Sequence, residues 1–239
     1  MSAWEKIGED ASIVLVGSFN PSIFHPEWFI RHEILADWNY PGRRSSSDKP
    51  SVATMPDLAQ VEFQNQRNLQ VMLNKFTLGC ARASEYLSLK DIAISTFGIL
   101  QETPITQMGM NYTAVIQIAD KDLWIKFGEL MAPKEPWVAA APYINDLDKE
   151  KQDALGLLEM TMQMPRPDDL KGFIRPTLKA LDLVSRTLSI SINNHVVIED
   201  NSAATMIDYL NGHWEIALDF ADDFIKKALS SQLEEGGLG

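Results

Sequence analysis

TLSISINNHVVIE, the stretch from Thr187 to Glu199, alternates between two kinds of side chain along most of its length. The alternate positions form a largely apolar set, Leu188, Ile190, Ile192, Asn194, Val196 and Ile198, and a polar set, Ser189, Ser191, Asn193, His195 and Glu199. Successive side chains of a strand point to opposite faces, so this period predicts a strand with one face buried and the other in water. Half-solvated strands of this kind are typical of antiparallel sheets.

The same alternation recurs elsewhere in the chain. It predicts further strands at residues 12–18, 61–74 (a pair broken by a turn near 65–68), 106–119, 157–164 and 172–184. Helical spacing and capping residues predict helices from Pro26, from a Ser84 cap to about Leu100, over 120–131, and from a Ser202 cap to about Leu233. The expected fold class is therefore α+β, with mostly antiparallel sheet, helices packed on one side and a long C-terminal helix.

We expect a single domain over residues 1–239 with two irregular segments. The Pro-, Gly- and Ser-rich stretch at about 40–55 predicts a mobile loop, and the glycine-rich end at about 234–239 predicts a frayed tail. Strand and helix order also allows two loosely similar halves, although no residue-level repeat supports them.

Composition excludes several classes of protein. The net charge of −12 argues against nucleic acid or anionic membrane as a partner. Cys80 is the single cysteine, which excludes an internal disulfide or a multi-cysteine zinc site, and its small, apolar neighbours predict a buried, inert thiol. No stretch approaches the ~20 apolar residues of a membrane span. A soluble, cytoplasmic protein is expected.

Several strings are distinctive: VGSFNPSIFHPEWF, PITQMGMNY, LMAPKEPW, and SISINNHVVIE followed by a terminal helix that contains a tryptophan. In this order they resemble an uncharacterised family of bacterial hypothetical proteins. The resemblance covers most of the chain. It implies a bacterial origin and one continuous domain, and it implies no chemistry.

The stretch GSFNPSIFHPEWFIRHEIL, residues 17–35, gathers polar groups that invite comparison with a metal site. If Pro26 begins a helix, His25 and His32 lie about two turns apart, too far to share one metal ion. We therefore expect no metal here, with His25 before the helix and Glu27 in its first turn. Asn20 precedes Pro21, which predicts a turn; alternatively Asn20 presents its amide to a ligand.

Asn194 is the polar exception on the apolar side of its strand. An unsatisfied buried amide costs a few kcal/mol, so Asn194 is expected to bond a structural partner, a water or a ligand. His195 lies on the polar side, about 13 Å along the strand from Ser191, which rules out a Ser-His pair. Asn20, Asn111, Tyr112, Asn194 and His195 are the candidate ligand-binding residues. No catalytic constellation and no cofactor motif emerges.

Three hypotheses for function remain. The first is a non-enzymatic interaction or scaffold protein that self-associates, most simply as a homodimer, or binds a protein partner; the apolar seam of the terminal helix suggests it. Its candidate interface residues are Lys134, Trp137 and Trp214. The second is a small-molecule binding protein or enzyme with a pocket between the sheet and the C-terminal helix. The third is an acidic inhibitor that mimics nucleic acid.

Overall fold

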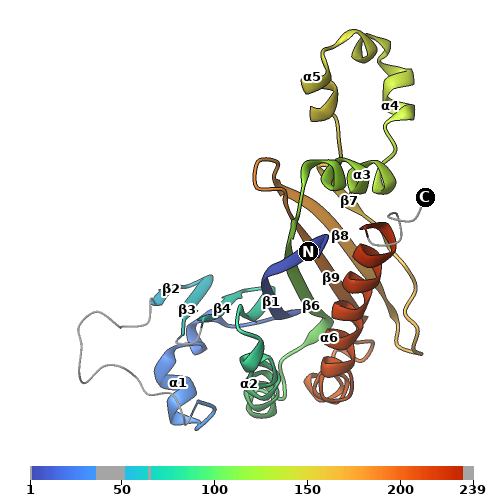
Figure 1. The fold of residues 1–239 in the computed structure, drawn as a ribbon. Helices are drawn as coiled ribbons and strands as arrows, with labels where there is room; N and C mark the ends of the chain where they lie inside the picture. The colour runs from blue at the N-terminus through green and yellow to red at the C-terminus, as the bar shows by residue number, and fades with distance from the viewer. Residues whose placement is uncertain (1, 36–51, 64–65, 234–239) are drawn as a thin grey trace.

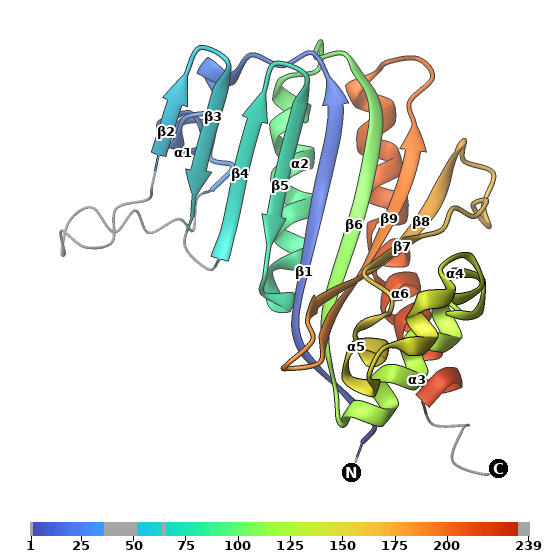
Figure 2. The same cartoon turned by 90° about the horizontal axis from the view of Figure 1, so that it is seen from above.

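The computed structural model describes residues 2–35, 52–63 and 66–233, and these form a nine-stranded antiparallel sheet with helices (Figures 1 and 2). The strand order is β2-β3-β4-β5-β1-β6-β9-β8-β7. Two long strands, β1 (Trp4–Gly17) and β6 (Ile105–Ile118), pair antiparallel at its centre, with Ser12 opposite Asn111. The α+β fold class expected from the alternation is confirmed.

The other strands continue the sheet on either side of this central pair. On the β1 side lie β5 (Lys75–Cys80), β4 (Arg67–Met72), β3 (Leu58–Glu62) and β2 (Val52–Met55). On the β6 side lie β9 (Thr187–Val197), β8 (Gly172–Asp182) and the short terminal strand β7 (Glu159–Thr161). Each of these strands runs antiparallel to its neighbours in the sheet.

Helices cover one face of the sheet. The long helices α2 (Tyr86–Ile99) and α6 (Ala203–Leu233) lie side by side behind the strands in Figure 2, and the short α1 (Pro26–Arg31) joins them beside β3. Ser202 caps α6 as expected, since its Oγ accepts from the backbone of Ala204 at 3.1 Å. No helix in the described part of the chain is both long and apolar enough to cross a membrane.

The element order repeats between the two halves of the chain. Each half begins with a long central strand, β1 or β6, continues through short helical elements into a run of strands, and ends with a long helix, α2 or α6. The side chains buried between the sheet and these helices form one continuous cluster that includes Phe76, Phe97 and Trp214. The core therefore runs through both halves.

An arm of short helices projects beyond one end of the sheet (Figure 1). It comprises α3 (Lys121–Met131), α4 (Glu135–Ala140), a 3₁₀ turn (Pro142–Asp146) and α5 (Lys149–Ala154). Asp120 caps α3 by accepting from the backbone of Leu123 at 2.8 Å. Helical spacing correctly predicted α3, whereas α4 and α5 were not expected after the proline-rich segment.

Several local predictions were wrong. Residues 52–55 form the edge strand β2 rather than loop, while 40–51 and 234–239 lie outside the described residues. The strand β5 around Cys80 was missed because its glycine and cysteine weaken the polar-apolar contrast. Ser84 does not cap α2, which begins after a 3₁₀ turn (Ala83–Glu85) with Glu85 at the cap position.

Candidate functional site

The sheet separates the candidate ligand-binding residues onto two faces. Asn111 and His195 point to the open face, whereas Tyr112 and Asn194 point to the face covered by helices, where both are buried. Adjacent residues of a strand must point in opposite directions. The five candidates therefore cannot form one site, and each is best described by its own surroundings.

Asn194 has a structural partner, as its buried position required. The Arg166 side chain is only 2% exposed, and its guanidinium donates to Asn194 Oδ1 and, at 3.2 Å, to the carbonyl of His195. Asp168 then accepts two hydrogen bonds from the same guanidinium, at 2.7 and 2.6 Å, and Arg166 lowers the pKa of that carboxyl group. This arrangement fastens the 165–171 segment to β9.

Tyr112 belongs to an ionic cluster between the sheet and α6. Its hydroxyl donates to Glu9 at 2.5 Å, and Lys6 Nζ donates to Glu9 at 2.5 Å, to the Tyr112 hydroxyl at 2.9 Å and to Asp222 at 3.2 Å. Lys226 also pairs with Asp222, at 2.5 Å. The cluster joins β1, β6 and α6, which makes it a link between the two layers.

Charge pairing determines how this cluster titrates. Burial alone would raise the pKa of Glu9, but hydrogen bonds from Lys6 and Tyr112 outweigh it and lower that pKa. Burial would likewise raise the pKa of Asp222, but Lys226 and Lys6 outweigh it and lower that pKa. Burial and the hydrogen bond to Glu9 raise the pKa of Tyr112, so its hydroxyl stays protonated at neutral pH.

Polar side chains form a row across the open face. Strand register places Ser12, Asn111, Asn193 and Arg175 in line across β1, β6, β9 and β8. Asn111 Nδ2 donates to Ser12 Oγ at 3.4 Å, whereas the buried Asn193 Oδ1 has no hydrogen-bond partner among the described residues. The row places one serine hydroxyl beside two amides and a guanidinium, none of which is a general base.

His195 lies beside this row in a stack of flat side chains. Its ring lies on Phe173 with centroids 4.4 Å apart, and the Arg175 guanidinium lies 4.3 Å from the Phe173 centroid. Burial, together with Arg175 and Arg166, lowers the pKa of His195. Ser191 bonds Thr113 at 3.1 Å. The contacts of His195 are thus a ring stack on Phe173 and two nearby arginines that disfavour its protonated form, an arrangement typical of side-chain packing.

The histidine-rich stretch at residues 17–35 is a structural connection. Asn20 Oδ1 accepts from the backbone of Ser22 at 3.1 Å and caps the 3₁₀ turn Pro21–Ile23, which fits the turn interpretation of Asn20. His25 occupies the N-cap position of α1 without a side-chain cap and pairs instead with Glu27. Within the described residues, no group of three or more histidine, cysteine or acidic side chains could hold a metal ion.

One row of apolar side chains on the terminal helix α6 is buried in the core. Met206, Leu210, Trp214, Ala221, Ile225 and Leu229 are all buried against the sheet and α2. Trp214 has 0% exposure and its Nε1 donates to the carbonyl of Tyr86 at 3.0 Å. The assignment of Trp214 to an interface was therefore wrong, because a side chain enclosed by its own chain offers no surface to a partner.

The acidic residues of α6 are largely paired with lysines. Glu215 bonds Lys90 at 2.6 Å, and Asp223 bonds Lys227 at 2.6 Å, in addition to the Asp222 pairs described above. The nucleic-acid mimicry hypothesis needs two regular rows of free carboxylates on one surface. Pairing with lysines weakens the field that such rows would present.

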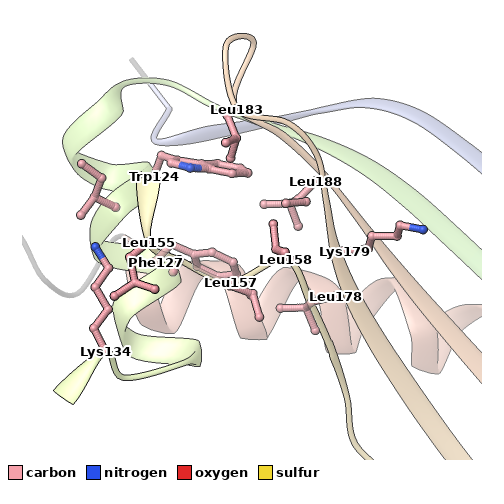
Figure 3. A pocket seen from close by; sticks show the side chains of 14 residues that line it. Trp124, Phe127, Lys134, Leu155, Leu157, Leu158, Leu178, Lys179, Leu183 and Leu188 are labelled. Carbon is pink, nitrogen blue, oxygen red and sulfur yellow. The ribbon is translucent and has the colours of Figure 1, made fainter. Parts of the chain in front are cut away.

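The arm carries an apolar groove, which we call the leucine groove. It consists of a small cavity of about 50 Å³ and an adjoining hollow of about 370 Å³. The hollow is lined by Ala132, Lys134, Trp137 and the 155–159 segment. The cavity shares Leu155, Leu157 and Leu158 with it and is also lined by Trp124, Phe127, Leu178, Leu183 and Leu188. Figure 3 shows the cavity's side chains gathered between α3 and the strands. The groove opens where the arm meets β7 and β8.

Large apolar side chains at this groove remain exposed. Trp137 is 65% exposed and Leu158 is 72% exposed, and Lys134 beside them pairs with Glu129 at 3.2 Å. Further along the edge strand Met162 is 59% exposed. Lys134 and Trp137 therefore stay candidate interface residues. Leu158 and Met162 stay exposed because β7 is the last strand of the sheet, a position that the apolar alternation of residues 157–164 does not reveal.

No protein-family model and no curated protein matches this chain. The resemblance to a family of bacterial proteins therefore stays a prediction. The surfaces and contacts described above remain as the guide to function.

Proposed function

We propose that this protein is an interaction module that self-associates, and that the leucine groove with its exposed rim is the surface it uses. The observation that carries the proposal is the exposure of Trp137 and Leu158 around an apolar hollow of about 370 Å³. Tryptophan is among the residues most enriched at the centres of interfaces, since it buries a large area in a pocket.

The polar groups of the molecule support the same conclusion by elimination. Asn194, Tyr112 and Asn20 have partners within the chain, and His195 is stacked on Phe173. Acid–base and nucleophilic catalysis each need a general base or a nucleophile whose neighbours activate it. The ion pairs and hydrogen bonds described here instead hold segments of the chain to one another.

Apolar surface suited to self-association lies on the arm rather than on α6. The seam of α6 suggested a dimer from the sequence, but much of that seam, including Leu210, Trp214 and Ala221, packs in the core. Exposed apolar side chains gather around the groove and the neighbouring sheet edge, where Leu183 at 53% and Met162 at 59% exposure add to them, although others such as Met55 and Leu73 are exposed elsewhere. Apolar surface gathered in this way favours association with another protein surface.

Light scattering across a range of concentrations tests the proposal with two matched variants. Trp137→Ala removes the main rim residue, and we expect it to raise the dimer dissociation constant about tenfold or more, as for an interface hot spot. Leu87→Ala on α2 removes a side chain of similar exposure, 55%, far from the arm and should leave the constant unchanged. Equal effects of the two substitutions, or a wild type that stays monomeric, would contradict the proposal.

A further inference from the structure

The strand β7 is the last of the sheet, and its outer edge pairs with no other strand of the described chain. The backbone of Met162 and Met164 donates to Pro176 and Ile174 of β8, and Leu158 accepts from Ala180. These even-numbered residues therefore direct their N–H and C=O groups inward to β8. In an extended strand the alternate residues direct theirs the opposite way, so Glu159, Thr161 and Gln163 present donors and acceptors outward.

The side chains of the same segment alternate between the two faces of the sheet. Met160 pairs with Leu178 of β8, which places the even-numbered side chains on the helix-covered face of the sheet. Leu158 and Met162, on either side of Met160, are 72% and 59% exposed. The apolar layer under the sheet therefore continues to the edge without being covered there. An exposed apolar edge strand is a template for pairing with another strand.

We propose that two copies of the chain pair antiparallel through β7, with Met160 opposite Met160 of the second copy. This inference rests on the proposed function, because it locates the self-association. The pairing joins the two sheets into one continuous sheet across a two-fold axis. Outward backbone groups of Glu159 and Thr161 then meet their counterparts in the second copy, which gives each a hydrogen-bond partner.

The register follows from the side chains that it places together. With Met160 on the axis, Leu158 lies opposite Met162 of the second copy on the helix-covered face, so the two exposed apolar residues cover one another. On the open face Glu159 lies opposite Thr161, whose Oγ1 already bonds Thr177 at 2.9 Å. Glu159 keeps Lys179 as its own partner at 3.7 Å. No like charges lie directly opposite each other in this register. The two Glu159 side chains are diagonal neighbours on the open face, and each has Lys179 of its own chain beside it.

The leucine groove adds a second contact to this pairing. Leu158 lines the groove together with Trp137 and Leu155. A residue placed opposite Leu158 lies next to that hollow, so the thioether of Met162 from the second copy can enter it. Methionine suits such a site because its unbranched, polarisable side chain fills irregular gaps. The expected role of Trp137 in self-association follows from this position.

A charge-swap experiment tests the pairing and its register. Leu158→Lys and Met162→Glu each place a charge opposite an apolar residue, and each should raise the dimer dissociation constant about tenfold or more, a change of ~1.4 kcal/mol. In an equimolar mixture, the lysine of L158K in one chain meets the glutamate of M162E in the other, while the unchanged Leu158 and Met162 still face each other. The mixture should recover a 1:1 dimer of near wild-type affinity by native mass spectrometry.

A backbone variant distinguishes strand pairing from side-chain contact. Thr161→Pro removes the outward backbone N–H and leaves the hydrogen bonds from β7 to β8 in place. Thr161→Ala is the control, because both substitutions remove the threonine hydroxyl but alanine keeps the N–H. We expect the proline variant alone to abolish the dimer, with the melting temperature of both variants recorded as a check on folding. If T161P misfolds, the mixture of L158K and M162E alone tests whether the two copies pair through β7.

The outcomes separate this inference from the proposed function. A wild type that is monomeric throughout contradicts both. A dimer that survives Leu158→Lys, Met162→Glu and Thr161→Pro shows self-association through another surface and overturns the β7 pairing alone. If L158K and M162E each weaken the dimer and their equimolar mixture does not recover its affinity, the register with Leu158 opposite Met162 is wrong.

Discussion

Single buried polar residues explain much of how this chain is held together. The 2% exposed Arg166 is the clearest case, since one guanidinium satisfies the amide of Asn194, the carbonyl of His195 and the carboxylate of Asp168. An arginine is suited to this task because its planar fork offers several donors in fixed directions. The buried amide oxygen of Asn194 thereby has a structural partner within the chain.

Removing that guanidinium should destabilise the fold. Arg166→Met leaves the Asn194 amide without its partner, and we expect the free energy of unfolding to fall by about 2 kcal/mol. The value is below that of a fully buried pair because Asp168 is 31% exposed. Urea denaturation measures it. The double variant Arg166→Met/Asn194→Leu should cost less than the sum of the single changes, whereas simple additivity would contradict the coupling.

The cluster around Tyr112 predicts a pH dependence of stability. Glu9 and Asp222 have a folded-state pKa below the ordinary carboxyl value. Their contribution is therefore fully present above a pH of about 4.5 and is lost as pH falls through the folded pKa values. Tyr112→Phe removes one hydrogen bond to Glu9 and should lower the free energy of unfolding by about 1 kcal/mol at pH 7.

Denaturation of both proteins at neutral, mildly acidic and strongly acidic pH checks this expectation. The difference in free energy of unfolding between wild type and Tyr112→Phe should shrink towards the most acidic condition. There Glu9 is protonated, and it accepts a weaker hydrogen bond from the Tyr112 hydroxyl than a carboxylate does. A difference that grows with acidity would contradict the assignment of the cluster's charge states.

At the scale of the elements, α6 is an interior element of the fold rather than a free seam. Its buried apolar residues lie against the sheet and α2, with Trp214 completely enclosed. Trp214→Ala should lower the free energy of unfolding by about 3–5 kcal/mol, as for other large-to-small changes of a core aromatic residue. Ile216→Ala on the same helix, at a position 63% exposed, should change it by less than about 0.5 kcal/mol. Thermal and chemical denaturation compare the two, and equal losses would contradict the placement of the seam.

The elements that the sequence predicted well share one property. The strands β6 and β9 and the helix α6 have strict periods because each has one buried and one solvated face. A period predicts only which side chains share a face, however. It could not show that α6 packs its seam on the sheet, since a seam that faces a second helix in a dimer has the same spacing.

The exposure of the edge strand β7 escaped prediction for a different physical reason. Residues 155–164 are rich in leucine and methionine, which is equally typical of a central strand and of an exposed edge. Their exposure depends on which strand ends the sheet, a property of the strand order that no local pattern carries. The exposure of Leu158 and Met162 could therefore not be predicted from the sequence. Trp137, in its proline-flanked segment, lies at the surface, as a candidate interface residue must.

At the scale of the whole molecule, net charge opposes the association that apolar surface favours. Each chain carries −12, so two copies repel one another at long range. Salt screens that repulsion, with a Debye length of ~10 Å at 0.1 M. The dimer dissociation constant should therefore fall severalfold when sodium chloride is raised from low concentration to physiological ionic strength. Light scattering at both salt concentrations checks it, and a constant that rises with salt would point to an interface held by ion pairs.

Sedimentation equilibrium of the wild-type chain at several concentrations tests self-association most directly, because it reports mass independently of shape. We expect a monomer–dimer equilibrium that converges on twice the chain mass of 26.8 kDa as concentration rises. A single species of 26.8 kDa at every concentration would contradict self-association.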